Sequence, residues 1–264
     1  MLESLIINAG VTLALALVCW GISLITREVS FVDAVWGAAM ALLALLSFAQ
    51  NPAPGALAWL LVAMVVIWGA RLSLHLLLRY WRNGEDERYR RILADYRESG
   101  RFWLGSLVVV WLFQAFLLFV VCSPAQLGIL ASGEAQTIGL LAMLGLALWL
   151  AGIVFEWAGD WQLARFKRDP ANAGKVMQEG LWRYTRHPNY FGDFCVWWGI
   201  WLAAANADLM LALWTLPGPL FLSFTLIRWS GVGITERGMR DKYGAEFADY
   251  AQRTSAFLPL VPRN

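Results

Sequence analysis

The stretch Gly180 to Asp193, GLWRYTRHPNYFGD, holds the densest group of residues that could do chemistry. Its arginines and histidine supply charge and donors, its rings supply flat faces, and its amide and carboxylate supply directional hydrogen bonds. The candidate ligand-binding residues are Trp182, Tyr184, His187, Pro188, Asn189, Tyr190 and Asp193. This mixture suits an anionic or nucleotide ligand. The alternative is an aromatic and basic belt between two membrane spans.

A second group consists of ionisable residues inside apolar runs, where a charge is expensive and usually marks a site. Asp33 begins one such run, and Arg71, His75 and Arg79 fall on one helical face of another. We expect these acids and bases to meet in one cavity that faces the cytoplasm. The alternative is that Asp33 with Arg71 forms a structural pair between helices, and that His75 is a satisfied interior donor.

The composition identifies the kind of element that must position these residues. The chain has 264 residues, 59% of them apolar, with 16 Trp and a mean hydropathy of +0.54, which is typical of an integral membrane protein. Cys19, Cys122 and Cys195 are isolated in apolar runs, and His75 and His187 are the only histidines. Neither a disulfide framework nor a metal site is expected.

The apolar runs predict an all-α integral membrane protein with seven transmembrane helices in a single domain, 1–264. Pro124 predicts a kink or break within the fourth run. The tail from Gly231 to Asn264 is polar and partly amphipathic, and its Phe247, Tyr250, Phe257 and Leu258 are able to pack under the helix bundle. The expected spans are 5–25, 31–49, 56–78, 102–130, 138–157, 190–205 and 209–227.

The charges predict the orientation, because Lys and Arg near span ends collect on the cytoplasmic side. With the N-terminus outside and the C-terminus in the cytoplasm, the inward segments are 26–30, 79–101, 160–188 and 228–264. All 21 Lys and Arg lie in or beside these segments except Arg71. A six-span version would place some of this charge outside. Nucleic acid is not an expected partner for surfaces this close to a bilayer, and the oligomeric state is not readable.

Together, GLWRYTRHPNYFGD and the tail ITERGMRDKYGAEFADYAQRTSAFLPLVPR resemble membrane enzymes related to the C-terminal domain of steroid 5-alpha reductases. The chain is more similar to a bacterial, largely uncharacterised branch of that group, because FVDAVWG and RLSLHLLLRYWRNGEDERY match that branch as well. The superfamily also contains sterol C14 reductases and isoprenylcysteine and phospholipid methyltransferases. The resemblance implies a bacterial inner-membrane enzyme whose active site faces the cytoplasm.

The resemblance also implies a nucleotide cofactor in the region 102–264. The form Asn189-Tyr190-Phe191-Gly192-Asp193 is similar to that of the reductases, which use NADPH; the methyltransferases use S-adenosylmethionine. The residues that would contact the dinucleotide are Asp160, Lys167, Lys175, Asn189, Asp193 and Tyr243, with Glu236 from the tail motif. Phosphate groups also need cations such as Arg165, Lys167, Arg168 or Lys175.

Residues 1–101 would then face a lipophilic substrate that enters from the membrane lipid. Steroid reductases use a glutamate and a tyrosine there, and this chain has Arg71 nearest the tyrosine position. The replacement candidates for catalysis are Asp33, His75, Glu85, Asp86 and Tyr89. We expect an NADPH-dependent reductase of an activated C=C bond in a sterol-like, isoprenoid or fatty-acyl substrate. The rivals are an S-adenosylmethionine-dependent methyltransferase and a non-catalytic lipid-binding or transport protein.

Overall fold

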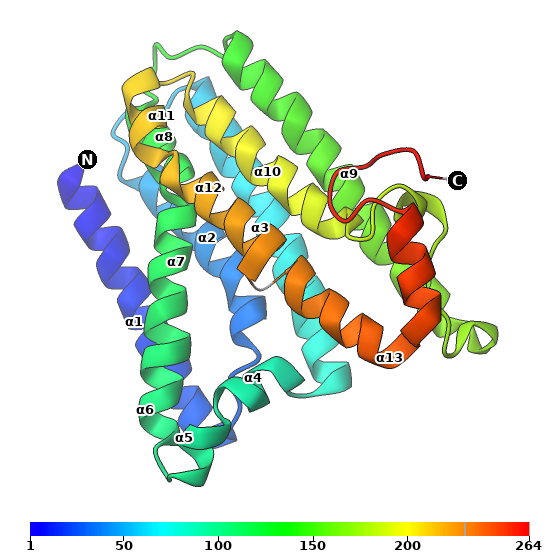
Figure 1. The fold of residues 1–264 in the computed structure, drawn as a ribbon. Helices are drawn as coiled ribbons and strands as arrows, with labels where there is room; N and C mark the ends of the chain where they lie inside the picture. Colours follow the sequence, from blue (N-terminus) through cyan, green and yellow to red (C-terminus); the bar gives the residue numbers. More distant parts are fainter. Residues whose placement is uncertain (230, 264) are drawn as a thin grey trace. The chain divides into compact units, whose positions relative to one another are not determined.

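The computed structural model describes residues 1–229 and 231–263, and these fold into helices (Figure 1). Over that part of the chain there is no strand; residues pair in β geometry only as two isolated bridges. The contacts divide the chain into two compact units. Unit 1 consists of Met1–Met143 with Ile200–Gly218, and unit 2 of Leu144–Gly199 with Pro219–Asn264. The all-α prediction is therefore confirmed.

Among the residues that the structure describes, six helical stretches are long and apolar enough to cross a membrane, by length and composition. They are Leu2–Thr26, Val32–Ala49, Ala56–Asn83, Phe102–Val121, Leu140–Arg168 and Leu209–Arg253. The helix expected as the sixth of seven spans, α10 (Pro188–Ala204), has 17 residues and is not among them. The membrane-protein prediction is supported, whereas the count of seven and the orientation stay predictions.

Unit 1 begins with α1 (Leu2–Thr26), α2 (Val32–Ala49) and α3 (Ala56–Asn83). The short helices α4 (Glu87–Ile92) and α5 (Ala94–Glu98) follow, then α6 (Phe102–Gly105), the π-helical η1 (Ser106–Leu112), α7 (Phe113–Val121) and α8 (Ser123–Ala131). The column of α6, η1 and α7 runs beside α1 (Figure 1). α7 ends just before Pro124, so the predicted break is confirmed. α11 (Leu209–Thr215) completes the unit and packs on α8.

A close helix crossing in unit 1 joins α2 to α3 at two glycines. A Cβ on Gly37 would lie 2.5 Å from the carbonyl oxygen of Gly69. Beside this crossing, the Ser73 hydroxyl accepts the backbone N–H of Ala38 at 2.7 Å. The missing side chains let the two backbones touch. This crossing fixes the ends of α2 and α3, where Asp33 and Arg79 lie.

Unit 2 contains most of α9 (Leu140–Arg168) and α10, then most of α12 (Pro217–Phe224), the π-helical η4 (Thr225–Trp229) and α13 (Val232–Arg253). α9 continues well past the expected span end at Trp157, so the basic residues up to Arg168 are helical. Two 3-10 turns, η2 (Pro170–Asn172) and η3 (Gly180–Arg183), lie in the following loop. α13 bends at Gly244, where φ is 52°.

The apolar face expected in the tail is present with one correction. Phe247, Tyr250 and Phe257 are buried, and Phe257 packs edge-on against Phe191 and Phe194. Leu258, however, is 54% exposed, because its neighbour Phe257 takes the inward position.

Candidate functional site

In unit 2, the first half of the motif Gly180–Asp193 is fixed by its aromatic and small residues. Gly180 has a φ of 59°, which suits glycine, and opens η3. The Trp182 indole is buried and donates to the carbonyl of Gly159 at 3.0 Å. In turn the Tyr250 hydroxyl donates to the carbonyl of Trp182. Trp182 therefore anchors this loop to both α9 and α13. Tyr184, by contrast, is 42% exposed.

The centre of the motif is tied to α13 by a buried carboxylate. Arg186 lies 2.7 Å from Glu236, and the His187 imidazole lies 3.4 Å from the same oxygen. The Arg186 guanidinium also donates to the carbonyls of Ala251 and Thr254. All three side chains of the Arg186, His187 and Glu236 cluster are at least 90% buried. The cluster holds the loop in register with the tail through one oxygen of Glu236, while its other oxygen lies 3.7 Å from Arg240.

The end of the motif places two polar groups between α9 and α10. Asn189 donates to the Asp160 carboxylate at 3.2 Å, and its side-chain oxygen accepts the N–H of Tyr190. The helices approach closely there, since a Cβ on Gly192 would lie 2.6 Å from the carbonyl of Gly152. The Tyr190 ring stacks on His187 with centroids 5.1 Å apart. Asn189 and Asp160 are only half-buried, so both can offer hydrogen bonds to a ligand.

Exposed cations crowd the end of α9 and the loop beyond it. Arg165, Lys167 and Arg168 occupy its last turn, and Lys175 follows η2. Arg165 lies over the Trp161 ring at 5.5 Å. Within the residues that the structure describes, Arg168 and Lys175 make no ion pair. Cations also complement the carbonyl end of any helix, but available guanidinium and ammonium groups are what phosphates require.

The remaining cofactor candidates lie in the same unit. Pro188 is buried at the first position of α10, and Asp193 lies half-buried further along that helix. Tyr243 packs against the buried cluster of Val176, Phe247 and Tyr250. All of the candidates that the sequence assigned to a cofactor therefore belong to unit 2.

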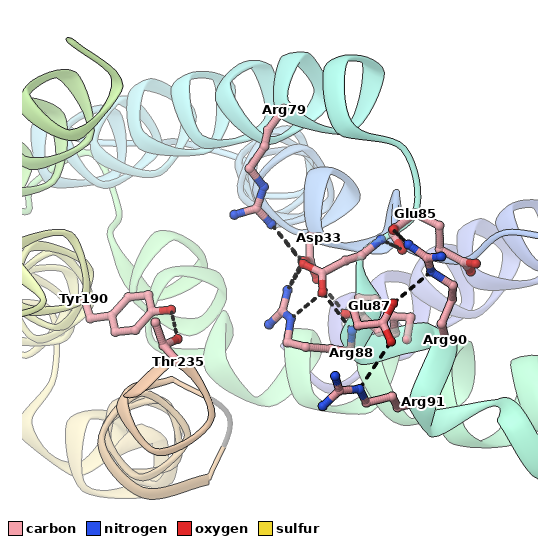
Figure 2. Close-up of polar contacts among 12 residues, drawn as sticks. Asp33, Arg79, Glu85, Glu87, Arg88, Arg90, Arg91, Tyr190 and Thr235 are labelled. Carbon is pink, nitrogen blue, oxygen red and sulfur yellow. Dashed lines mark hydrogen bonds and ion pairs between the residues drawn. The ribbon is translucent and has the colours of Figure 1, made fainter. Parts of the chain in front are cut away.

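All five catalytic candidates belong instead to unit 1, and Asp33, Glu85, Asp86 and Tyr89 meet near the start of α2 and the end of α3. Figure 2 shows Asp33 and Glu85 with the arginines around them. Asp33 accepts the Tyr89 hydroxyl at 2.6 Å on one oxygen and Arg88 at 2.8 Å on the other. Arg79 approaches the Arg88-bound oxygen at 3.6 Å. These residues, and not Arg71 as in the alternative of a structural pair, are the partners of Asp33. His75 is half-buried on α3, one turn before Arg79.

The segment after α3 supplies the other two carboxylates. Asp86 caps α4 by accepting the backbone N–H of Arg88 and also binds its guanidinium, while Glu85 pairs with Arg97 at 2.8 Å. Burial raises the pKa of Asp86, but the hydrogen bonds and charge of Arg88 outweigh it, so the pKa lies below its ordinary value. Burial keeps the pKa of Glu85 raised despite Arg97.

The same cluster shifts the pKa values of Tyr89 and Arg88. Burial first, and then the Asp33 carboxylate, raise the pKa of Tyr89 well above its ordinary value. Burial lowers the pKa of Arg88, but Asp33 and Asp86 raise it further, so the guanidinium stays charged. Tyr89 is thus a neutral donor to Asp33 and Arg88 is a fixed cation.

A cavity of about 330 Å³ opens beside this cluster. Its wall contains three of the catalytic candidates, Asp33, Glu85 and Asp86, and also residues that the sequence did not single out as site residues. Those are Ser30, Leu76, Arg79, Tyr80, Asn83, Gly84 and Glu87. Arg79 carried a signal, because it continues the face of Arg71 and His75. Ser30 and Asn83 carried none, since only the folding of the loop toward α2 brings them together.

One protein family, described as "Protein of unknown function (DUF1295)", matches residues 19–254 of the chain. This chain belongs to the DUF1295 family. The match covers both units, and so includes the motif Gly180–Asp193 as well as the Asp33 cluster.

The curated relatives of this DUF1295 chain include an uncharacterised protein and enzymes of two kinds. An uncharacterised protein of Schizosaccharomyces pombe is 25% identical over 92% of this chain and 76% of its own length. The rat 3-oxo-5-alpha-steroid 4-dehydrogenase 1 is 29% identical over 45% of this chain and 41% of its own. A probable protein-S-isoprenylcysteine O-methyltransferase of Oryza sativa subsp. indica is 30% identical over 33% of this chain and 42% of its own. The chain thus spans less than half of either enzyme. No solved structure matches.

Proposed function

We propose that this DUF1295 chain is a membrane-embedded, NADPH-dependent reductase of an activated C=C bond in a lipophilic substrate. The observation that carries the proposal is the arrangement of unit 2. There Asn189 and Asp160 join α10 to α9, and α9 ends in exposed cations. Similarity to the rat steroid dehydrogenase supports reduction as the reaction class. The substrate would be sterol-like, isoprenoid or fatty-acyl and would enter from the bilayer.

The residues of unit 2 fit a phosphorylated dinucleotide. Arg168 and Lys175 are exposed and can bind phosphate oxygens, and Asp160 with Asn189 can bind ribose or amide groups. Trp182 donates to a backbone carbonyl, and Arg186 pairs with Glu236, so the role of these three residues in the proposal is to hold the loop. When bound, the nicotinamide supplies a hydride to an electron-poor carbon.

Unit 1 would bind the substrate and stabilise the charge that develops on it. Asp33, Glu85 and Asp86 lie on the wall of its cavity, and Tyr89 and Arg88 hold Asp33 in position. A donor of unit 1 outside this cavity would hydrogen-bond the oxygen that becomes negative as the hydride is added, and a proton would complete the reduction at the neighbouring carbon. His75, on the same helix as Arg79, is the candidate for this donor. We propose that both units work at the cytoplasmic face of a bacterial inner membrane.

A second candidate is methyl transfer from S-adenosylmethionine, which the rice methyltransferase relative favours. That cofactor carries no phosphate, so it would not need Arg168 or Lys175. The two functions therefore differ in how far cofactor binding is weakened when these cations are removed.

The test is a calorimetric and thermal-shift titration of the detergent-purified chain with NADPH, NADH and S-adenosylmethionine. Ligand binding to the folded state raises its apparent stability. We expect NADPH alone to stabilise the protein. Lys175→Ala or Asn189→Ala should weaken the binding of NADPH about tenfold, because each removes one charge-assisted hydrogen bond. Arg82→Ala, which removes an exposed cation from unit 1, is the matched control. Stabilisation by S-adenosylmethionine alone, unaffected by Lys175→Ala, would establish the methyltransferase instead.

A further inference from the structure

The cavity of unit 1 is a candidate for ligand recognition because its wall offers both donors and acceptors. Acceptors come from the carboxylates of Asp33, Glu85 and Asp86, and donors from Arg79 and Asn83. The volume of about 330 Å³ corresponds to roughly ten water molecules of liquid. It is therefore the size of a polar head group rather than of a whole lipid.

Each carboxylate of this wall is already paired with an arginine that lies outside the wall. Arg88 binds both Asp33 and Asp86, Arg97 binds Glu85, and Arg90 and Arg91 bind Glu87. Of these cations none is part of the cavity wall. A cationic ligand would consequently find little uncompensated negative charge, although carboxylate oxygens keep free lone pairs for an O–H donor.

Arg79 is the cation of the cavity wall, and it is held loosely. Its Nη2 lies 3.6 Å from Asp33 and 3.7 Å from Asp86, beyond hydrogen-bond length, and its side chain is 45% exposed (Figure 2). Among the residues that the structure describes it makes no hydrogen bond. Its N–H groups are thus available to a ligand oxygen, but an anion bound there would lie close to two carboxylates. Asp33 and Asp86 with Arg79 and Arg88 form a charge-balanced set, which favours an uncharged ligand.

We propose that this cavity binds an uncharged, hydroxyl-bearing head group of the lipophilic substrate. Arg79 and Asn83 would donate hydrogen bonds to the hydroxyl oxygen, and a carboxylate of the wall would accept a hydrogen bond from the hydroxyl. A hydroxyl is both donor and acceptor, so it uses both halves of the wall, whereas a ketone uses one. Arg79 is a specificity-determining residue in this arrangement. The inference rests on the proposed function for its claim that the ligand is the substrate, while the binding itself needs no cofactor.

The test uses photoreactive amphiphiles with one common tail and four heads: alcohol, ketone, carboxylate and amine. The full chain in lipid nanodiscs is labelled without any nucleotide, and label in the peptide covering 76–87 is measured by mass spectrometry. We expect the alcohol to label at least about fivefold more than each other head, as one hydrogen bond predicts. Stronger labelling by the carboxylate, by the amine or by the ketone, or equal labelling by all four, would overturn the proposal.

Two variants connect the label to Arg79. Arg79→Ala should reduce labelling by the alcohol about tenfold, and Arg79→Gln should restore part of it because an amide still donates. Arg82→Ala, one turn along α3 and outside the cavity wall, should leave labelling unchanged. Thermal unfolding of each variant verifies that it folds. Unchanged labelling of Arg79→Ala would refute the assignment, and an absence of NADPH binding in the separate titration would refute the reductase without affecting this result.

Discussion

At the residue scale, Glu236 shows how a charged side chain can belong to a candidate site and still serve the fold. Its carboxylate is 9% exposed and receives Arg186 at 2.7 Å and His187 at 3.4 Å. The sequence places Glu236 among the cofactor residues because of the tail motif. The geometry favours a positioning role, since breaking a buried ion pair leaves an uncompensated charge.

We therefore predict that Glu236→Gln lowers the free energy of unfolding by about 3 kcal/mol, because Arg186 loses its buried countercharge. Asp249→Asn on the same helix is the matched control: its pair with Arg253 is exposed, so the expected change is at most about 1 kcal/mol. Thermal or denaturant unfolding in detergent measures both. Equal effects of the two substitutions would contradict the positioning role.

At the element scale, the packing of unit 1 depends on where its helices carry glycine. Gly37 and Gly69 let α2 and α3 touch, and this contact sets how the ends of both helices present Asp33 and Arg79. By contrast, Gly10 and Gly21 of α1 have no neighbouring atom within 4 Å of an added Cβ. Glycines of different helices thus differ in their role: those of α2 and α3 allow a close contact, whereas those of α1 do not.

We predict that Gly37→Ala destabilises the protein by about 1–3 kcal/mol, the usual cost of overpacking, because its Cβ would lie 2.5 Å from the Gly69 carbonyl oxygen. Gly10→Ala and Gly21→Ala should instead be neutral or stabilising by up to about 1 kcal/mol, since alanine favours the helix. Comparative thermal unfolding of the three variants distinguishes them. A neutral Gly37→Ala would show that the crossing can separate without cost.

At the scale of the whole molecule, the candidate residues divide between the two compact units. Unit 1 carries Asp33, Tyr89 and the cavity, and unit 2 carries Asp160, Asn189 and the cations. The proposed division of labour assigns the substrate to one unit and the cofactor to the other. The proposal therefore requires the proposed cofactor to reach unit 2 from the cytoplasm, so it depends on the orientation of the chain in the membrane.

We predict that the chain crosses the membrane seven times with its C-terminus in the cytoplasm, because its Lys and Arg collect in alternate loops. A cysteine at Glu134 should react with an impermeant maleimide in intact cells, and cysteines at Ala173 or Ala245 only after permeabilisation. The native Cys19, Cys122 and Cys195 are buried, so the background should be low. Labelling of position 173 in intact cells would contradict this topology.

The sequence by itself determined the class of the molecule and the approximate position of its elements. Apolar run length and composition predicted the helices, because a membrane demands long apolar segments with internally satisfied backbones. Pro124 predicted the break before α8, and residue order in the motif Gly180–Asp193 indicated the family. These features are local in the chain, so no three-dimensional information was needed.

Only the tertiary structure decided which of the candidate residues act together. Asp33 and Tyr89 lie far apart in the sequence, and their 2.6 Å hydrogen bond exists because the loop after α3 folds back onto the start of α2. Asp33 pairs with Arg88 beyond that loop and with Arg79 at the end of α3, and not with Arg71 as in the alternative of a structural pair. Helical periodicity gives the face of a side chain but not its partner on another element. Charge pairing and burial, which depend on contacts between distant segments, made Glu236 an anchor and left Arg79 open to a ligand.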